Sequence, residues 1–188
     1  MKFRGIAGLT VAAAVLCGFP FGRASAQSSP VMLMSANSSG LTANVVGVAY
    51  NNGHVSVQII IKNTNDMRVY LADARNDDSQ NGFLGSGADL GAPSIDGLPS
   101  CGNTYFACSS DTNATAIDRF SYIDPGNTLG VAMVYTDFQA PSSPDTVSFS
   151  LTMMARFSKS TADNSPDDAG AVQEITLSFP FVSFSQKQ

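Results

Sequence analysis

Strict alternation of apolar and polar residues constrains the fold of this chain more than any other feature of its sequence. Between residues 147 and 157 every second residue is apolar: Val147, Phe149, Leu151, Met153, Ala155 and Phe157. The residues between them are Ser148, Ser150, Thr152, Met154 and Arg156. A period of two places alternate side chains on opposite faces of a β-strand, so this segment predicts a strand with one face in a core and the other mostly in solvent.

Further strands are predicted along the chain. The alternation repeats at Val55, Val57, Ile59 and Ile61, and again at Ile175, Leu177, Phe179 and Phe181. Pro180 indicates an edge strand there, because proline has no backbone N–H for a neighbouring strand. Other strands are predicted at residues 31–34, 41–50, 67–73, 117–122 and 129–138. The sequence Val45-Val46-Gly47 interrupts the alternation of its strand and predicts a β-bulge.

Turn sequences separate these segments. Asn51-Asn52-Gly53 is typical of a tight hairpin, because Asn and Gly tolerate the left-handed backbone that such a turn requires. Asn63-Thr64-Asn65-Asp66 and Asp124-Pro125-Gly126 predict two further turns. Glu174 is the single glutamate among 15 acidic residues, and aspartate prefers turns and caps, whereas glutamate favours helices. The chain is therefore predicted to be all-β, an antiparallel sandwich of about seven to nine strands.

The first 26 residues have the features of a secretory signal peptide. Lys2 and Arg4 give a positive start, an apolar run covers residues 6–21, and Ala24-Ser25-Ala26 places small residues where signal peptidase reads them. Cleavage after Ala26 would leave one domain, residues 27–188, with seven basic residues, 15 acidic residues and a net charge of −8. The apolar run is too short for a membrane-spanning helix, and so acidic a chain repels nucleic acid. We expect a periplasmic or extracellular protein that neither spans a membrane nor binds nucleic acid.

The segment over residues 74–116 interrupts the alternation and is much longer than most loops. It contains Cys101 and Cys108, the two cysteines that remain once Cys17 is removed with the signal peptide. In an oxidising compartment so close a pair predicts a disulfide that closes a small loop. Because long loops on rigid scaffolds often carry function, the adjacent aromatic residues Tyr105 and Phe106 are candidate binding residues. The alternative is an elaborated crossover between the two sheets, with little core of its own, in which these two residues pack.

One part of this segment has the opening pattern of a calcium-binding loop. In Asp77-Asp78-Ser79-Gln80-Asn81-Gly82, alternate oxygen-bearing side chains precede a glycine, so Asp77, Ser79 and Asn81 are candidate calcium ligands. The acid that closes such a loop is missing, because Ala88 stands at the twelfth position. A solvated turn explains the same sequence.

Catalytic residues are not recognisable in the sequence. His54 is the only histidine, so a Ser-His-Asp arrangement would depend on it, yet it follows a hairpin turn where an exposed histidine is ordinary. The aspartates lie in polar turns, whereas a glycosidase pair needs one carboxyl group in an apolar setting. We therefore predict that the chain is not an enzyme and binds no cofactor.

Two turns and their neighbouring strands carry a family resemblance. The strand over residues 55–62 runs into Asn63-Thr64-Asn65, and Pro125-Gly126 precedes a strand that ends in the aromatic residue Phe138. This order resembles small extracytoplasmic bacterial domains that have an immunoglobulin-like β-sandwich. The resemblance implies that fold and a non-catalytic binding or accessory role, and it transfers no functional residue.

These observations predict a secreted, non-enzymatic interaction or accessory module of a bacterial envelope or cell surface. Its partner would be another envelope or extracellular protein, or a glycan. Two alternatives stay open. A structural subunit of a surface assembly would exchange strands through residues 27–37. A small extracytoplasmic hydrolase or lyase would bring Asp and His side chains together in one pocket.

Overall fold

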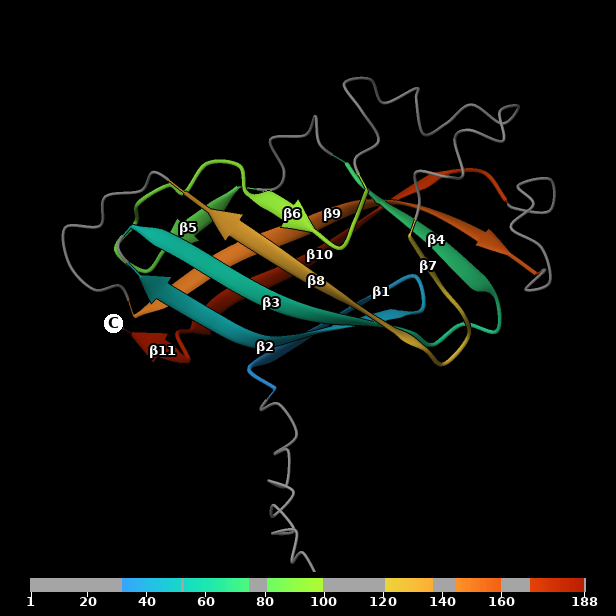
Figure 1. Ribbon diagram of the computed structural model, residues 1–188, viewed down its shortest axis with the longest axis horizontal. Coiled ribbons are helices and arrows are strands. Elements are labelled where there is room, and N and C mark those ends of the chain that lie inside the picture. Colours follow the sequence, from blue (N-terminus) through green and yellow to red (C-terminus); the bar gives the residue numbers. More distant parts are fainter. Residues whose placement is uncertain are drawn as a thin grey trace, which may run out of the picture.

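The computed structural model describes residues 32–51, 53–74, 81–99, 121–136, 145–159 and 170–187, and within these ranges its regular structure consists of strands. The strands form two sheets, which are antiparallel except for one short parallel pair. Figure 1 shows how the strands are arranged, and residues of both sheets contribute to a common apolar core. The predicted all-β class is therefore confirmed. In the described ranges, no helix has the length and apolar character that crossing a membrane requires.

The first sheet has the strand order β1-β2-β3-β8-β6. Its strands are β1 (Met34–Ser38), β2 (Leu41–Asn51), β3 (His54–Asn63), β6 (Ser94–Asp96) and β8 (Thr128–Tyr135). β1 pairs with the first half of β2, and β11 (Gln186–Lys187) pairs in parallel with the end of β2. The edge of β2 opposite β3 is thus covered by two short segments, one from each end of the described chain.

The second sheet has the strand order β10-β9-β4-β7. Its strands are β4 (Arg68–Asp73), β7 (Ser121–Ile123), β9 (Thr146–Ser158) and β10 (Gln173–Ser183). On the edge of β9 opposite β10, β4 pairs with the second half and β5 (Gly82–Leu84) with the first half. The described residues form eleven strands rather than about seven to nine. Three of them were not predicted, β5, β6 and β11, because each is only two or three residues long and too short to show an alternation.

The alternating apolar residues fill the core as predicted. β9 buries Val147, Phe149, Leu151 and Met153, and β3 buries Val55, Val57, Ile59 and Ile61. All eight belong to one apolar cluster between the sheets. The pattern succeeded because it depends only on the period of the strand, which is local.

The alternation near the C-terminus misled the prediction at one residue. Phe181 was expected in the core, but 74% of its surface is exposed. The register between β9 and β10 shifts between Phe179 and Val182, and Phe181 has a φ of 54°. This bulge inserts an extra residue into β10. Val182 therefore occupies the buried position, and the Phe181 side chain points into solvent.

The bulge predicted in β2 is confirmed. The register between β2 and β3 shifts between Val45 and Gly47. Beyond it, Ser185 N donates to Val48 O at 2.8 Å, and Val48 N donates to Ser185 Oγ at 3.0 Å. The C-terminal segment therefore satisfies backbone groups of β2 that β1 does not reach.

The predicted hairpin and Pro-Gly turns are also confirmed. Asn51 pairs with His54 at the end of the β2–β3 hairpin, where Gly53 has a φ of 81°. Asn127 N donates to Asp124 O at 3.0 Å, which closes the turn between β7 and β8. His54 is exposed at the start of β3, as expected.

Some predicted strands differ in extent. The strand predicted at 31–34 shares only Met34 with β1. Residues 34–37 of β1 pair with β2 of the same chain, and they belong to the segment considered for strand exchange. The strand predicted at 117–122 is described only as β7, and that predicted at 129–138 only as β8. Phe138 lies outside the described residues.

Asn63 holds together two connections that cross between the sheets at one end of the protein, the β3–β4 connection and the β7–β8 turn. Its buried Nδ2 donates to Met67 O at 2.7 Å and to Ile123 O at 2.9 Å, while its Oδ1 accepts from Asn65 N at 3.0 Å. Its backbone N–H donates to Asn127 O at 3.0 Å. The β3–β4 connection is therefore tied to the β7–β8 turn through one side chain and its backbone.

Arg68 reinforces the same end of the molecule. Its Nε donates to Asp124 Oδ1 at 2.6 Å, and its guanidinium lies 4.3 Å from the centre of the Tyr122 ring. The hydrogen bond to Asp124 is the main cause that raises the pKa of Arg68 above its ordinary value. The buried guanidinium thus remains charged while it stacks on the ring.

The long segment after β4 has more core than expected. In its described part, residues 81–99, the buried residues Leu84, Leu90, Ile95 and Leu98 join the main apolar cluster. β5 and β6 attach this part to the second and the first sheet, respectively. Cys101 and Cys108, and the disulfide predicted between them, lie outside the described residues.

Candidate functional site

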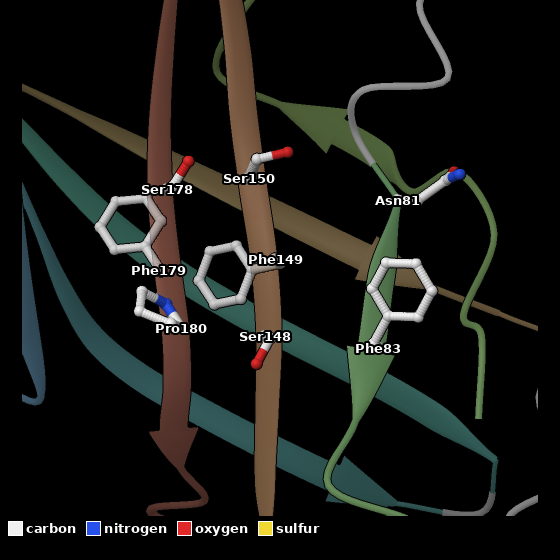
Figure 2. A pocket seen from close by; sticks show the side chains of 8 residues that line it. All are labelled: Asn81, Phe83, Ser148, Phe149, Ser150, Ser178, Phe179 and Pro180. Atoms are coloured by element: carbon white, nitrogen blue, oxygen red, sulfur yellow. The ribbon is translucent and has the colours of Figure 1, made fainter. Parts of the chain in front are cut away.

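The outer face of the second sheet has two dissimilar halves. At one end, Tyr70, Ala72, Ala74 and Met154 form a second buried apolar cluster, so the predicted solvent face of β9 is not solvated there. At the other end the face is open and carries a groove of about 410 Å³. Figure 2 shows the residues that line this groove: Asn81, Phe83, Ser148, Phe149, Ser150, Ser178, Phe179 and Pro180. We call it the β5–β9–β10 groove.

Strand β5 positions the aromatic side of the groove. Phe83 pairs with Ser148 of β9, and 49% of the Phe83 surface is exposed. The preceding residue, Gly82, leaves room for a buried neighbour: a Cβ atom there would lie 3.0 Å from the Cζ atom of Tyr135. Leu90 N donates to Gly82 O at 2.7 Å and fixes β5 from its other side. Phe83 is therefore held on a strand bonded along both edges.

Hydroxyl groups from β9 and β10 form the floor of the groove. Ser150 pairs with Ser178 across the two strands (Figure 2). One step further along the same face, the Thr152 and Thr176 hydroxyl oxygens lie 3.0 Å apart in a hydrogen bond. Thr152 is fully buried, so the hydroxyl groups of this row that line the groove are those of Ser150 and Ser178. Each serine hydroxyl is a neutral group that can donate one hydrogen bond and accept others.

The bulge in β10 closes the side of the groove opposite Phe83. Ser148 lies opposite the bulge, and its Oγ accepts a hydrogen bond of 2.9 Å from Phe181 N. Pro180 lines the groove, and the next residue, Phe181, extends into solvent. Below them, the Phe149 and Phe179 rings stack with centroids 4.9 Å apart and planes inclined by 25°. The floor of the groove is therefore backed, on its core side, by two stacked aromatic rings.

The lining of the groove carries no ionisable side chain among the described residues. Its polar groups are serine hydroxyls and the Asn81 amide, and its exposed apolar groups are the Phe83 ring and Pro180, because the Phe149 and Phe179 rings are buried in the core. Beneath β5, burial raises the pKa of Tyr135 well above its ordinary value. The arrangement is suited to recognition of a neutral ligand by hydrogen bonds and ring contacts.

Two further grooves lie on the first sheet and differ in chemistry. One, of about 470 Å³, is lined largely by Val46, Ile60, Ala132 and glycine backbone, with Asp96 at one side. The other, of about 290 Å³, lies at the bulge of β2 beside Ser185. Neither has an aromatic residue in its lining. Of these three grooves of the described residues, the β5–β9–β10 groove is therefore the strongest candidate site.

The structure describes only one of the residues predicted to form a site. Asn81, a candidate calcium ligand, lines the β5–β9–β10 groove. Asp77 and Ser79, and the candidate binding residues Tyr105 and Phe106, lie outside the described residues. Within the described part of the chain, no three His, Cys, Asp or Glu side chains lie close enough to hold a metal ion.

Two aromatic residues at the groove, Phe83 in its lining and Phe181 next to the lining residue Pro180, were missed or misassigned from the sequence. Phe83 lies in a segment without visible alternation, and the signal that identifies it is the pairing of β5 with β9, which is not local. Phe181 was assigned to the core by its spacing from Phe179. Ser148 and Ser150 were correctly placed on the outer face of their strand, but their neighbours could not be known.

Comparisons with known proteins place the chain in no family. No protein-family model matches it, and no curated protein sequence matches it. A comparison of solved structures finds AvmM, described as catalysing macrocyclization in alchivemycin A biosynthesis, which covers 79% of this chain and 91% of its own. The sequence identity is 10% and the TM-score is 0.28, so this likeness carries no argument about fold or activity.

Proposed function

We propose that the protein is a secreted, non-enzymatic binding module of a bacterial envelope or cell surface, and that the β5–β9–β10 groove is its binding face. The observation that carries this proposal is Phe83, a half-exposed aromatic side chain held on a strand beside a row of hydroxyl groups. An exposed ring desolvates readily when a ligand covers it, while the hydroxyl groups orient that ligand.

The proposed fold is an immunoglobulin-like sandwich, and the strand order supports it. In such domains the first, second and fifth strands share one sheet, and the third, sixth and seventh share the other. The seven strands β2, β3, β4, β7, β8, β9 and β10 follow this order in the chain: β2-β3-β8 are neighbours, and so are β4-β9-β10. The fourth strand, β7, pairs with β4 rather than β8.

The proposed location rests on the N-terminal sequence. Lys2, Arg4, the apolar run and Ala24-Ser25-Ala26 are the features that an export signal requires. The intact mass of the exported protein is the direct measurement, and we expect it to correspond to residues 27–188. The same spectrum tests the Cys101–Cys108 disulfide, because reduction would add the mass of two hydrogen atoms.

Site-specific photo-crosslinking tests the binding face. The photoreactive analogue benzoylphenylalanine would replace Phe83 in the exported full-length protein, followed by irradiation in intact cells of the source organism. Tyr122 is the matched control position, because it is an aromatic residue with 51% exposure on another short strand of the same sheet. We expect an adduct from position 83 that is absent from position 122. Equal labelling at both positions, or none at position 83, would overturn the proposed binding face.

A further inference from the structure

We infer, on the basis of the proposed binding function, that the ligand of the β5–β9–β10 groove is a neutral polysaccharide chain. Sugar rings have an apolar C–H face and edges that carry hydroxyl groups. The groove offers the complement of both surfaces, with Phe83 for the apolar face and Ser148, Ser150, Ser178 and Asn81 for the hydroxyl groups.

The aromatic contribution is pre-organised. β5 is bonded to β9 on one edge and to residues 88–90 on the other, so Phe83 loses little backbone freedom when a ligand binds. Its side chain stands next to Ser148, its cross-strand partner. A ring and a hydroxyl group are thus presented side by side from two fixed strands.

The hydroxyl groups form a regular array because strand geometry sets their spacing. Ser148 and Ser150 are two residues apart on β9, which corresponds to about 7 Å along the strand. Ser178 is the partner of Ser150 on β10, which corresponds to about 5 Å across the sheet. Serine hydroxyls and the Asn81 amide both donate and accept, so they can pair with sugar hydroxyls in either sense.

Charge selects against acidic polysaccharides. The lining described above holds neither a lysine nor an arginine that would pair with a carboxylate or sulfate group. The whole chain carries a net charge of −5, which repels polyanions in general. The lining residues come from β5 and from the neighbouring strands β9 and β10 (Figure 2). A groove that extends over several strands suits an internal stretch of a chain.

Titration with defined oligosaccharides tests the inference. The neutral probes are cellohexaose, maltohexaose, mannohexaose and chitohexaose, and an alginate hexasaccharide is the anionic comparison. Each probe is added to the isotope-labelled protein of residues 27–188. Amide NMR shifts and calorimetry measure the binding. We expect at least one neutral probe to bind and to shift amides of β5, β9 and β10, while alginate causes no shift there.

Three variants separate ligand contact from folding. Phe83→Ala should weaken the binding of the neutral probe about tenfold or more, Phe83→Trp should retain it within about threefold, and Tyr122→Ala should leave it unchanged. If every neutral probe fails, or alginate binds more tightly, the saccharide inference is wrong. If the neutral probes fail but position 83 still gives a protein adduct in the photo-crosslinking experiment, the proposed binding face stands. If both the adduct and the NMR shifts are absent, the binding face and the saccharide inference are both wrong.

Discussion

The Asn63 side chain donates a hydrogen bond of 2.9 Å to the backbone oxygen of Ile123, sixty residues further along the chain. This bond joins the end of β3, in the first sheet, to the end of β7, in the second. The same amide group also donates to Met67 O and accepts from Asn65 N. One buried side chain thus secures both crossovers at this end of the protein.

Replacement of Asn63 by Ala should lower the free energy of unfolding by about 2–4 kcal/mol, because it leaves buried backbone groups without partners. Denaturation in urea measures the change. Thr64→Ala is the control, since the Thr64 hydroxyl bonds to Gly40 O at an exposed position and should contribute less than about 1 kcal/mol. Similar losses for the two variants would contradict the role assigned to Asn63.

Phe179 and Phe181 should respond very differently to truncation, although they share the same alternating pattern in the sequence. Phe179→Ala removes a fully buried ring that stacks on Phe149 and should cost about 3–5 kcal/mol. Phe181→Ala removes an exposed side chain and should change the free energy of unfolding by about 0.5 kcal/mol or less. Chemical denaturation of both variants measures this difference, and equal losses would show that β10 has no bulge.

Gly82 leaves little room for a side chain, because an added Cβ would lie 3.0 Å from Tyr135 and from Leu90 and would force these neighbours to shift. We expect Gly82→Ala to lower the free energy of unfolding by about 1–3 kcal/mol through overpacking. Gly130, on β8, is the control, because an added Cβ there meets no atom within 4 Å. Thermal denaturation should show a lower midpoint for Gly82→Ala and a nearly unchanged one for Gly130→Ala. The reverse order would mean that β5 does not pack on Tyr135.

Stability should fall in alkaline solution because of Tyr135. Burial raises the pKa of its hydroxyl in the folded protein above the ordinary value of 10.0. As the pH rises above about 10 the unfolded chain releases this proton first, so the free energy of unfolding falls by up to about 1.4 kcal/mol per pH unit. Below that pH the contribution is fully present.

Urea denaturation between pH 8 and pH 11 measures this dependence. Tyr135→Phe should flatten the slope above pH 10, since phenylalanine has no proton to release. Parallel slopes for the wild-type protein and Tyr135→Phe would rule out Tyr135 as the cause. The comparison concerns the slopes only, so any constant change in stability from the lost hydroxyl does not affect it.

The sequence by itself determined the strands with a regular period, the faces that they bury, and the turns between them. Val147 to Met153, the bulge at Val45-Val46-Gly47 and the Asn51–His54 hairpin were all predictable, because side-chain alternation and turn preference act over a few residues. Asn63 was recognised as part of a turn for the same reason, although its distant partner Ile123 was not.

Tertiary structure alone decided the candidate site. The pairing of β5 with β9 brings Phe83 beside Ser148, which is sixty-five residues away in the chain, and no local pattern encodes that contact. The bulge in β10 exposes Phe181 by a register shift that becomes visible only when β9 is its partner. A binding surface of this kind depends on which strands meet and in which register, and the packing of the whole core sets both.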